Sequence, residues 1–254
     1  MGIVDDSLIG AATLVRGPHE ADDLGGSTRG ITHRDILQLD SGGEGHLNTS
    51  GGVDKRATLC LFAKPPIAGR VKTRLAAEVG AVRAAELAAA FLADCWHVQW
   101  PKRVLATTDA SFDFGFDAER WSQGEGDLGA RIERILRRAG LGIAIGADSP
   151  GFPLGALDDA NEALLAGNAA MGRALDGGYW LLGLPECPEG ILADLPWSSA
   201  TTADATEARL RLWGFEVHQV DPWFDIDSGS DLDHFRRRVP RARAPRTWSV
   251  LGDG

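Results

Sequence analysis

The chain has 254 residues, of which 44 % are hydrophobic and 24 % charged, a composition typical of a folded globular protein. Its formal net charge of −10 argues against a nucleic-acid-binding protein that works by overall electrostatic attraction. Three cysteines without CxxC spacing do not suit a disulfide scaffold, and neither a long apolar run nor a secretion signal is present, so we expect a cytoplasmic protein without a membrane span.

Residues 1–56 differ from the rest of the chain. They are rich in glycine mixed with Asp, Ser, Thr and His, and they hold few apolar side chains. Such a segment buries too little apolar surface to offset the entropy lost on ordering. We therefore expect an N-terminal extension that is either disordered or docks on a partner subunit, which would favour an oligomer.

From residue 58 onward, strand and helix patterns alternate. Short apolar runs predict strands at 59–63, 104–108, 141–145, 169–174, 179–184 and 215–220. Apolar residues at helical spacing predict helices at 81–99, 128–136, 155–166, 202–213 and 230–238. This alternation predicts a three-layer α/β/α fold with a mainly parallel, doubly wound sheet over residues 57–239.

The Arg- and Pro-rich residues 240–254 come last. We expect a solvated tail that proline keeps out of helix, with a partner- or RNA-binding tail as the alternative.

The loop after the first predicted strand is strongly basic. It holds two of the chain's four lysines and two arginines: Lys64, Arg70, Lys72 and Arg74. Gly69 and the nearby prolines would fix the loop's shape, and Thr73 could cap a following helix. Because ligands of such sheets bind beyond the carboxyl ends of the strands, this cluster predicts a polyphosphate site. The spacing of a P-loop is absent.

Aspartates follow two later strands. Asp148 stands between Gly and Pro after the third predicted strand, and Asp225 and Asp227 lie on one side of the chain after the last. Mg²⁺ uses one or two carboxylates and takes its other ligands from phosphates and water. We predict a Mg²⁺ or Mn²⁺ site at Asp148, Asp227 and Asp225, with a helix N-cap as the alternative role of Asp227.

Three further stretches are candidates for binding. The turn Asp176-Gly177-Gly178 either lets a ligand approach the backbone or is a tight turn between strands. The loop 124–129 has a formal GxGxxG pattern, but residues 119–122 make a poor strand, so we reject a dinucleotide fingerprint and expect this loop, with Asp127 near the helix start, to hold a base or ribose. Residues 196–199 either cap the helix at 202 or wall an acceptor pocket.

Other enzyme classes find no support in the sequence. There is neither a Gly-x-Ser-x-Gly elbow nor a His-Glu-x-x-His motif, and the six histidines are scattered. We therefore expect no catalytic histidine.

Taken in order, these stretches resemble a bacterial family of GT-A-like transferases, the selenodomain-associated transferases. The likeness spans about residues 58–238 and also includes Gln123 and Arg131. Its motifs are Phe62-Ala63-Lys64-Pro65, Gly69-Arg70-Val71-Lys72-Thr73-Arg74-Leu75, Gly126-Asp127-Leu128-Gly129, Gly146-Ala147-Asp148-Ser149-Pro150, Asp176-Gly177-Gly178-Tyr179, Pro196-Trp197-Ser198 and Asp225-Ile226-Asp227. The basic loop is also similar to that of 2-phospho-L-lactate guanylyltransferase and, more distantly, of sugar-phosphate nucleotidyltransferases.

The resemblance implies a nucleotide-diphospho-sugar transferase fold, with the basic loop and Gln123 on the nucleotide and Asp148 as the metal-binding aspartate. In one place the chain departs from the family: Arg173 stands where proline is usual. Arg173 either contacts an anionic acceptor or is tolerated at a strand edge.

Three functions remain open. The first is metal-dependent nucleotidyl transfer from an NTP to a phosphate- or phosphonate-bearing small molecule, because four cations suit a triphosphate and leaving pyrophosphate. The second is glycosyl transfer from a nucleotide sugar, and the third is nucleotide binding without turnover. The expected catalytic residues are Lys64, Lys72, Arg74 and Asp148; the nucleotide site adds Gly69, Arg70, Thr73, Gln123 and Asp127; the acceptor site holds Arg173, Asp176, Gly177, Gly178, Trp197 and Ser198.

Overall fold

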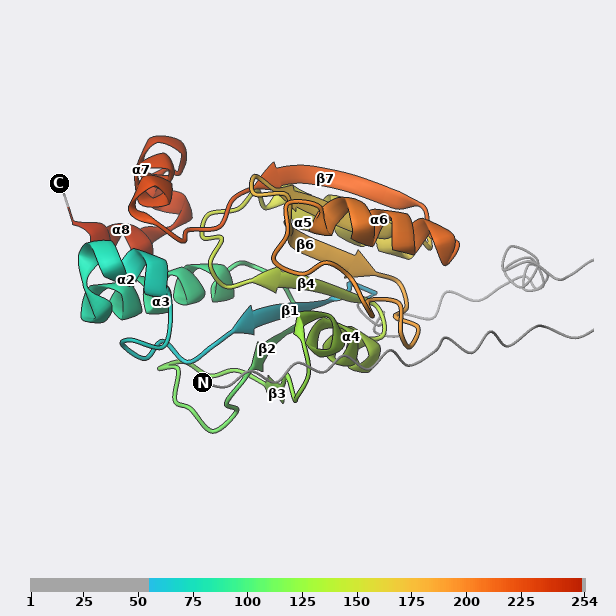
Figure 1. Ribbon diagram of the computed structural model, residues 1–254, viewed down its shortest axis with the longest axis horizontal. Helices are drawn as coiled ribbons and strands as arrows, with labels where there is room; N and C mark the ends of the chain where they lie inside the picture. The colour runs from blue at the N-terminus through green and yellow to red at the C-terminus, as the bar shows by residue number, and fades with distance from the viewer. Residues whose placement is uncertain (1–54, 253–254) are drawn as a thin grey trace, which may run out of the picture. The chain divides into compact units, whose positions relative to one another are not determined.

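The computed structural model describes residues 55–252, which form one mixed sheet covered by helices on both faces (Figure 1). The strands are β1 (Thr58–Ala63), β2 (Arg103–Thr107), β3 (Arg120–Ser122), β4 (Gly142–Gly146), β5 (Ala169–Ala174), β6 (Tyr179–Leu184) and β7 (Val217–Trp223). The helices are α2 (Thr73–Val79), α3 (Ala81–Trp96), α4 (Leu128–Ala139), α5 (Gly155–Leu165), α6 (Thr202–Leu212), α7 (Gly229–Arg238), the 3-10 turn η1 (Arg241–Arg243) and α8 (Pro245–Leu251). The predicted N-terminal extension, apart from residues 55 and 56, lies outside the described residues.

The sheet has the strand order β3-β2-β1-β4-β6-β5-β7. Four of the six neighbouring strand pairs are parallel: β3 with β2, β2 with β1, β1 with β4, and β5 with β7. Only β6 runs against its two neighbours, β4 and β5. The predicted α/β fold with a mainly parallel sheet is confirmed.

Alternation along the strands builds the three layers. In β1, Leu59 and Leu61 enter the core beneath α3 and α5, whereas Cys60 enters a smaller cluster with Ile135 of α4. Helices α4 and α6 pack on the second face through Leu136 and Leu210, among others. Both faces of the central strands are therefore buried, which accounts for their nearly continuous apolar sequences. Among residues 55–252, no helix has the length and apolar character needed to cross a bilayer.

Strand β3 corrects the expectation for residues 119–122. This three-residue strand pairs with the edge strand β2, with Ala106 opposite Trp121. Only Trp121 of its three side chains is buried. A single buried aromatic suffices at a sheet edge but leaves no alternating pattern in the sequence, so our interpretation of these residues as a poor strand is wrong.

The start of α2 also differs from the prediction. The N-cap residue is Lys72 in the left-handed conformation (φ 47°), and no side chain caps this end. Thr73 is therefore the first helical residue and not the predicted cap.

The C-terminal residues are helical rather than a solvated tail, and this expectation is wrong. Pro245 begins α8, as its fixed φ and missing N–H allow at the first turn. The buried carboxylate of Asp94 in α3 accepts hydrogen bonds from the backbone N–H groups of Arg246 (3.0 Å) and Thr247 (2.8 Å). The indole of Trp248 donates to the carbonyl of Val239 at 3.0 Å. These contacts fix α8 against α3.

Candidate functional site

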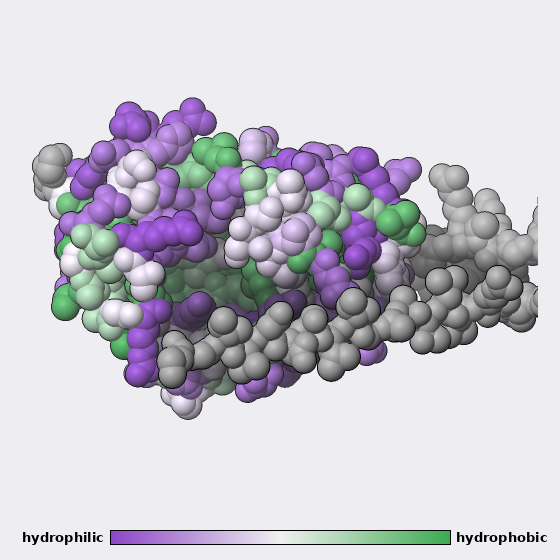
Figure 2. Space-filling view, viewed as in Figure 1, coloured by the Kyte–Doolittle hydropathy of each residue, from purple (hydrophilic) through white to green (hydrophobic). Residues whose placement is uncertain are grey.

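A cleft of about 750 Å³ opens at the carboxyl ends of β1 and β4. Its floor is apolar and includes Phe62, Phe91, Leu92 and Ile132, while its rim carries the basic loop and several aspartates. Figure 2 shows a hollow with a hydrophobic floor between hydrophilic rims on this side of the molecule. Such a cleft with an apolar floor and convergent charged groups is a typical ligand site.

Three cations of the basic loop border the cleft without a partner. Lys64, Arg70 and Arg74 are exposed, and their side chains form no hydrogen bond or ion pair with any residue of 55–252. In an acidic protein, unpaired positive charge gathered at one cleft favours an anionic ligand. The predicted residues Thr73, Gln123 and Asp127 also line the cleft, whereas Gly69 is not among its lining residues.

Two carboxylates face these cations from separate segments. Asp148 follows β4 and Asp227 follows β7, and both line the cleft. The backbone N–H of Ile226 donates to the carbonyl of Asp148 at 3.0 Å, and the Ser149 hydroxyl donates to Oδ1 of Asp225. A Cβ at Gly146 would lie 2.5 Å from Oδ1 of Asp148, so glycine at this position leaves room for the carboxylate. The fold thus brings the predicted aspartates together.

The Lys72 ammonium lies between these carboxylates. Its Nζ is 2.8 Å from Oδ2 of Asp148 and 2.7 Å from Oδ1 of Asp227. Burial alone would lower the pKa of Lys72, but the charges and hydrogen bonds of the two carboxylates outweigh burial and raise this pKa above its usual value. Its left-handed backbone conformation costs a non-glycine residue about 1–2 kcal/mol, a kind of strain found mostly at functional sites.

Asp225 is the most buried carboxyl group of the set. Burial, followed by the negative charge of Asp148, raises the pKa of Asp225 to about 7, against a smaller lowering by the hydrogen bond from Ser149. Because Asp225 is largely buried while the side chains of Asp148 and Asp227 are partly exposed, Asp225 is less accessible to a metal ion than they are.

The donor set suits a hard divalent cation. Within residues 55–252 no group of three or more His, Cys, Asp or Glu side chains is close enough to form a complete metal site. Two carboxylates converging on one point, beside a cleft with room for phosphate oxygens, nevertheless match what Mg²⁺ requires. Asp148 and Asp227 would hold such an ion, and the metal site stays a prediction.

Gln123 has a fixed orientation in the cleft wall. Its amide Nε2 donates to the carbonyl of Ala106 at 2.9 Å and, more weakly, to that of Ala63 at 3.4 Å, and the residue is 5 % exposed. The opposite amide orientation would place an oxygen against two carbonyl oxygens and is excluded. The amide oxygen forms no hydrogen bond within residues 55–252, so it remains available as an acceptor on a residue that lines the cleft.

The Gly-rich loop before α4 serves the packing of this helix. Asp127 is the N-cap of α4, and its carboxylate accepts from the N–H of Ala130 at 2.8 Å. A Cβ at Gly129 would lie 2.5 Å from the carbonyl oxygen of Leu192, so this glycine permits close helix packing. The strand required for a dinucleotide fingerprint does exist as β3, but a carboxylate at the helix N-terminus would repel a pyrophosphate there.

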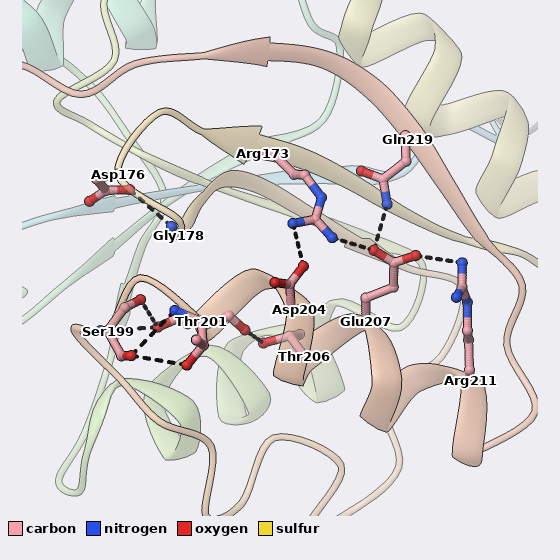
Figure 3. Close-up of polar contacts among 11 residues, drawn as sticks. Arg173, Asp176, Gly178, Ser199, Thr201, Asp204, Thr206, Glu207, Arg211 and Gln219 are labelled. Carbon is pink, nitrogen blue, oxygen red and sulfur yellow. Dashed lines mark hydrogen bonds and ion pairs between the residues drawn. The ribbon is translucent and has the colours of Figure 1, made fainter.

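The predicted acceptor residues lie apart from the cleft lining. In Figure 3, the turn of Asp176 and Gly178 lies beside the start of α6, and Asp176 accepts from the N–H of Gly178 at 2.9 Å. Gly177 has a φ of 90°, and a Cβ there would lie 2.1 Å from the carbonyl oxygen of Ala200. This glycine therefore allows a close approach of the chain to itself, which supports the tight-turn alternative.

Arg173 is held by acidic residues of α6. Its guanidinium lies 2.8 Å from Asp204 and 2.6 Å from Glu207, and the hydrogen bonds to Glu207 and Asp204 raise the pKa of Arg173 (Figure 3). Trp197 packs edge-to-face on Tyr179 with ring centroids 6.3 Å apart. Tyr179 lines the cleft, so Trp197 supports its wall from behind.

Sequence reasoning assigned no binding role to three residues that line the cleft. Arg131 lies one turn after Asp127 in α4, so helical spacing could have identified it. Tyr179 and Trp180 of β6 also line the cleft. Their position directly after the Gly-Gly pair was the available signal.

Comparisons with known proteins agree with this geometry. A family model described as an uncharacterized protein conserved in bacteria (DUF2064) matches residues 81–199. The chain is similar to a solved structure named as a nucleotide-diphospho-sugar transferase, from Desulfovibrio desulfuricans G20, at 26 % identity and a TM-score of 0.67. That match covers 76 % of this chain and 93 % of the other. The predicted resemblance to transferases of this fold is confirmed.

More distant structures also match. Rv0371c from Mycobacterium tuberculosis H37Rv is 15 % identical over 72 % of this chain and 98 % of its own, with a TM-score of 0.43. The inositol-1-phosphate CTP transferase from T. maritima is 12 % identical over 78 % of this chain and 98 % of its own, with a TM-score of 0.44. No curated protein matches the sequence significantly.

Proposed function

We propose that this protein is a divalent-cation-dependent nucleotidyltransferase. It would join an NTP to a small molecule bearing a phosphate or phosphonate and release pyrophosphate. The observation that carries this proposal is the set of unpaired cations, Lys64, Arg70 and Arg74, at a cleft that also presents Asp148 and Asp227.

The unpaired cations are the reason for proposing a nucleoside triphosphate as the substrate. Arginine forks and a lysine point charge bind phosphate oxygens, and three such groups without carboxylate partners leave their full charge for the ligand. They would also stabilise pyrophosphate as it leaves, because negative charge develops on that group in the transition state. A divalent cation held by Asp148 and Asp227 would add neutralising charge at the phosphates.

The reaction needs little further chemistry from the protein. An oxygen of the acceptor's phosphate or phosphonate attacks the α-phosphorus, and the bond to the bridging oxygen of pyrophosphate breaks. Because the attacking oxygen is already ionised at neutral pH, no general base is required. The chain's residues would hold the two substrates in line and neutralise charge, which suffices for phosphoryl-type transfer.

Gln123 is our candidate for contact with the nucleobase. Gln123 lines the cleft, and its Nε2 is engaged by backbone carbonyls, which leaves its amide oxygen as the free hydrogen-bonding atom. It can therefore accept from an N–H group of a base, and the rigid orientation would reject a base edge that presents an acceptor there.

Glycosyl transfer from a nucleotide sugar is the second candidate. It is favoured by the likeness to the structure from Desulfovibrio desulfuricans, which is named as a nucleotide-diphospho-sugar transferase. The same carboxylates and cations would then hold the diphosphate that leaves.

A thermal-shift titration separates the candidates. The full chain is melted with Mg²⁺ and each of ATP, GTP, CTP, UTP and dTTP, beside UDP- and GDP-sugars, because a ligand bound by the native state raises its stability. A shift with one NTP, followed by pyrophosphate release in a screen of phosphorylated acceptors, supports nucleotidyl transfer. A shift with nucleotide sugars alone favours the second candidate, and retention of nucleotide without turnover of any acceptor points to a binding module.

A matched pair of variants ties the shift to the cleft. Arg74→Met removes an unpaired cleft cation, and Arg137→Met removes an arginine of a surface ion pair with Glu189. The proposal expects the ligand-induced shift to fall in Arg74→Met and to persist in Arg137→Met. Equal shifts in both variants would contradict it.

A further inference from the structure

The Lys72 ammonium already fills the point on which two candidate metal ligands converge. It bridges Asp148 and Asp227 at 2.8 and 2.7 Å, and the Lys72 side chain is 11 % exposed while the carboxylates are 38 % and 48 % exposed. The two carboxylates thus share one protein-supplied positive charge and keep an open side toward the cleft.

A divalent cation cannot share this arrangement at low cost. Any cation that bridged both carboxylates would come within a few ångströms of the ammonium, and like charges at that distance repel, the more so because the Lys72 side chain is mostly buried. Lys72 already occupies one oxygen of each carboxylate, Oδ2 of Asp148 and Oδ1 of Asp227.

The Lys72 side chain has another destination close by. It lies in the same loop as Lys64 and Arg70 and two residues before Arg74 of α2, all of which line the cleft, and its four-carbon stem is flexible. An ammonium displaced from the carboxylates could therefore bind phosphate oxygens in the cleft.

We propose that Lys72 and a divalent cation compete for Asp148 and Asp227, so that the cation binds tightly only together with a polyphosphate that takes over the released ammonium. The protein would accordingly take its ligand as a metal–polyphosphate complex, and free metal would bind weakly. The polyphosphate half of this inference rests on the proposed function, whereas the competition itself does not.

The first test measures Mn²⁺ alone. Binding to the full chain is followed by the electron paramagnetic resonance signal of free Mn²⁺, in wild type, Lys72→Met and the control Arg74→Met. Both variants remove one positive charge from the loop, but only Lys72 contacts the carboxylates. We expect Lys72→Met to bind Mn²⁺ at least tenfold more tightly than wild type, Arg74→Met to change less than threefold, and Asp148→Asn added to Lys72→Met to abolish the gain. Equal or weaker Mn²⁺ binding by Lys72→Met overturns the competition.

The second test uses inorganic tripolyphosphate, titrated by calorimetry as the free anion in EDTA and as a preformed Mn²⁺ complex. When the free anion binds, Lys72 stays with the carboxylates, so Lys72→Met should lose less than threefold in affinity for free tripolyphosphate. When the Mn²⁺ complex binds, the ammonium moves to the phosphates, so Lys72→Met should lose at least tenfold in affinity for that complex. Arg74→Met should lose similarly in both titrations. Equal losses for Lys72→Met overturn the transfer of the ammonium.

A third measurement uses the wild-type chain and does not depend on how the variant folds. The chain has four lysines, so the side-chain ammonium signal of Lys72 can be assigned by nuclear magnetic resonance. The signal should shift when Mg²⁺ and tripolyphosphate are added together. An unmoved signal at saturation overturns the inference. If no variant binds any polyphosphate, the proposed function fails, and the Mn²⁺ comparison still decides the competition.

Discussion

The backbone N–H of Ile226 donates a 3.0 Å hydrogen bond to the carbonyl oxygen of Asp148. This bond joins the loop after β4 to the loop after β7. It thereby helps to bring the carboxylates of Asp148 and Asp227 to the same ammonium group, that of Lys72. The relationship is a property of the tertiary fold, since the two segments belong to strands at different positions in the sheet.

The first prediction concerns metal binding by this pair. We expect Asp148→Asn to weaken Mn²⁺ binding in the presence of tripolyphosphate at least tenfold, because a neutral amide is a poorer ligand for a hard divalent cation. Calorimetry measures the affinity. Asp204→Asn, which alters an aspartate paired with Arg173 outside the cleft, is the control and should leave affinity unchanged. Unchanged affinity in Asp148→Asn would remove this residue from the metal site.

The second prediction concerns Gln123. Replacing it with leucine leaves the carbonyls of Ala106 and Ala63 without their donor, and we expect a loss of about 1–3 kcal/mol in the free energy of unfolding. The differences in binding affinity among the NTPs should also become smaller. Urea denaturation measures the stability, and Gln219→Leu at an exposed position should stay within about 0.5 kcal/mol of wild type. A Gln123 variant as stable as wild type would refute the buried hydrogen bonds.

The sequence alone predicts the layers of this fold well, because the buried strands are continuous apolar runs and the helices have one apolar face. It fails at β3, where one buried side chain, Trp121, holds an edge strand. It fails again at α8, because the burial of that helix depends on Asp94, a residue far back in the chain. Local composition cannot report either contact.

In the candidate site, too, the sequence predicts some features, while others depend on contacts between distant segments. The basic loop and Asp148 could be predicted because charged residues directly follow buried strands. The bridge from Lys72 to both aspartates could not, because three separate segments create it. Gly177 looked like a place for a ligand, but the space beside it is filled by Ala200, which the sequence does not show.

The third prediction therefore concerns Gly177. Gly177→Ala and Gly190→Ala both place alanine at a positive φ, of 90° and 82°, but only the first meets another part of the chain. We expect Gly190→Ala to lose about 1–2 kcal/mol from backbone strain alone. Gly177→Ala should lose about 1–3 kcal/mol more, because its Cβ would clash with Ala200. Urea denaturation compares the two, and equal losses would show that the turn has room for a side chain.

The fourth prediction concerns the end of the chain. Asp94→Ala removes the acceptor of two N–H groups at the start of α8, and we expect a loss of about 1–3 kcal/mol in unfolding free energy. Asp159→Ala, at an exposed position of α5, should change stability by less than about 0.5 kcal/mol. Faster proteolysis between residues 240 and 252 in Asp94→Ala would locate the loss. If Asp94→Ala were as stable as wild type, the result would favour the initial expectation that residues 240–254 form a solvated tail.

The last prediction concerns alkaline pH. Burial raises the pKa of the Cys60 and Cys187 thiols to about 12, and it also raises the pKa of Cys95. These thiols stay protonated in the folded protein while they ionise near pH 9 in the unfolded chain. The native state then binds more protons, so stability is complete below pH 9 and falls as pH rises toward 12.

Between pH 9 and 10, each of Cys60 and Cys187 should lower the free energy of unfolding by about 1 kcal/mol, since one pKa unit corresponds to about 1.4 kcal/mol. Urea denaturation at both pH values measures the loss, and Cys187→Ala should reduce it by about 1 kcal/mol if this thiol is as buried as the fold requires. An identical pH dependence in the variant would show that Cys187 ionises as readily in the folded protein as in the unfolded chain.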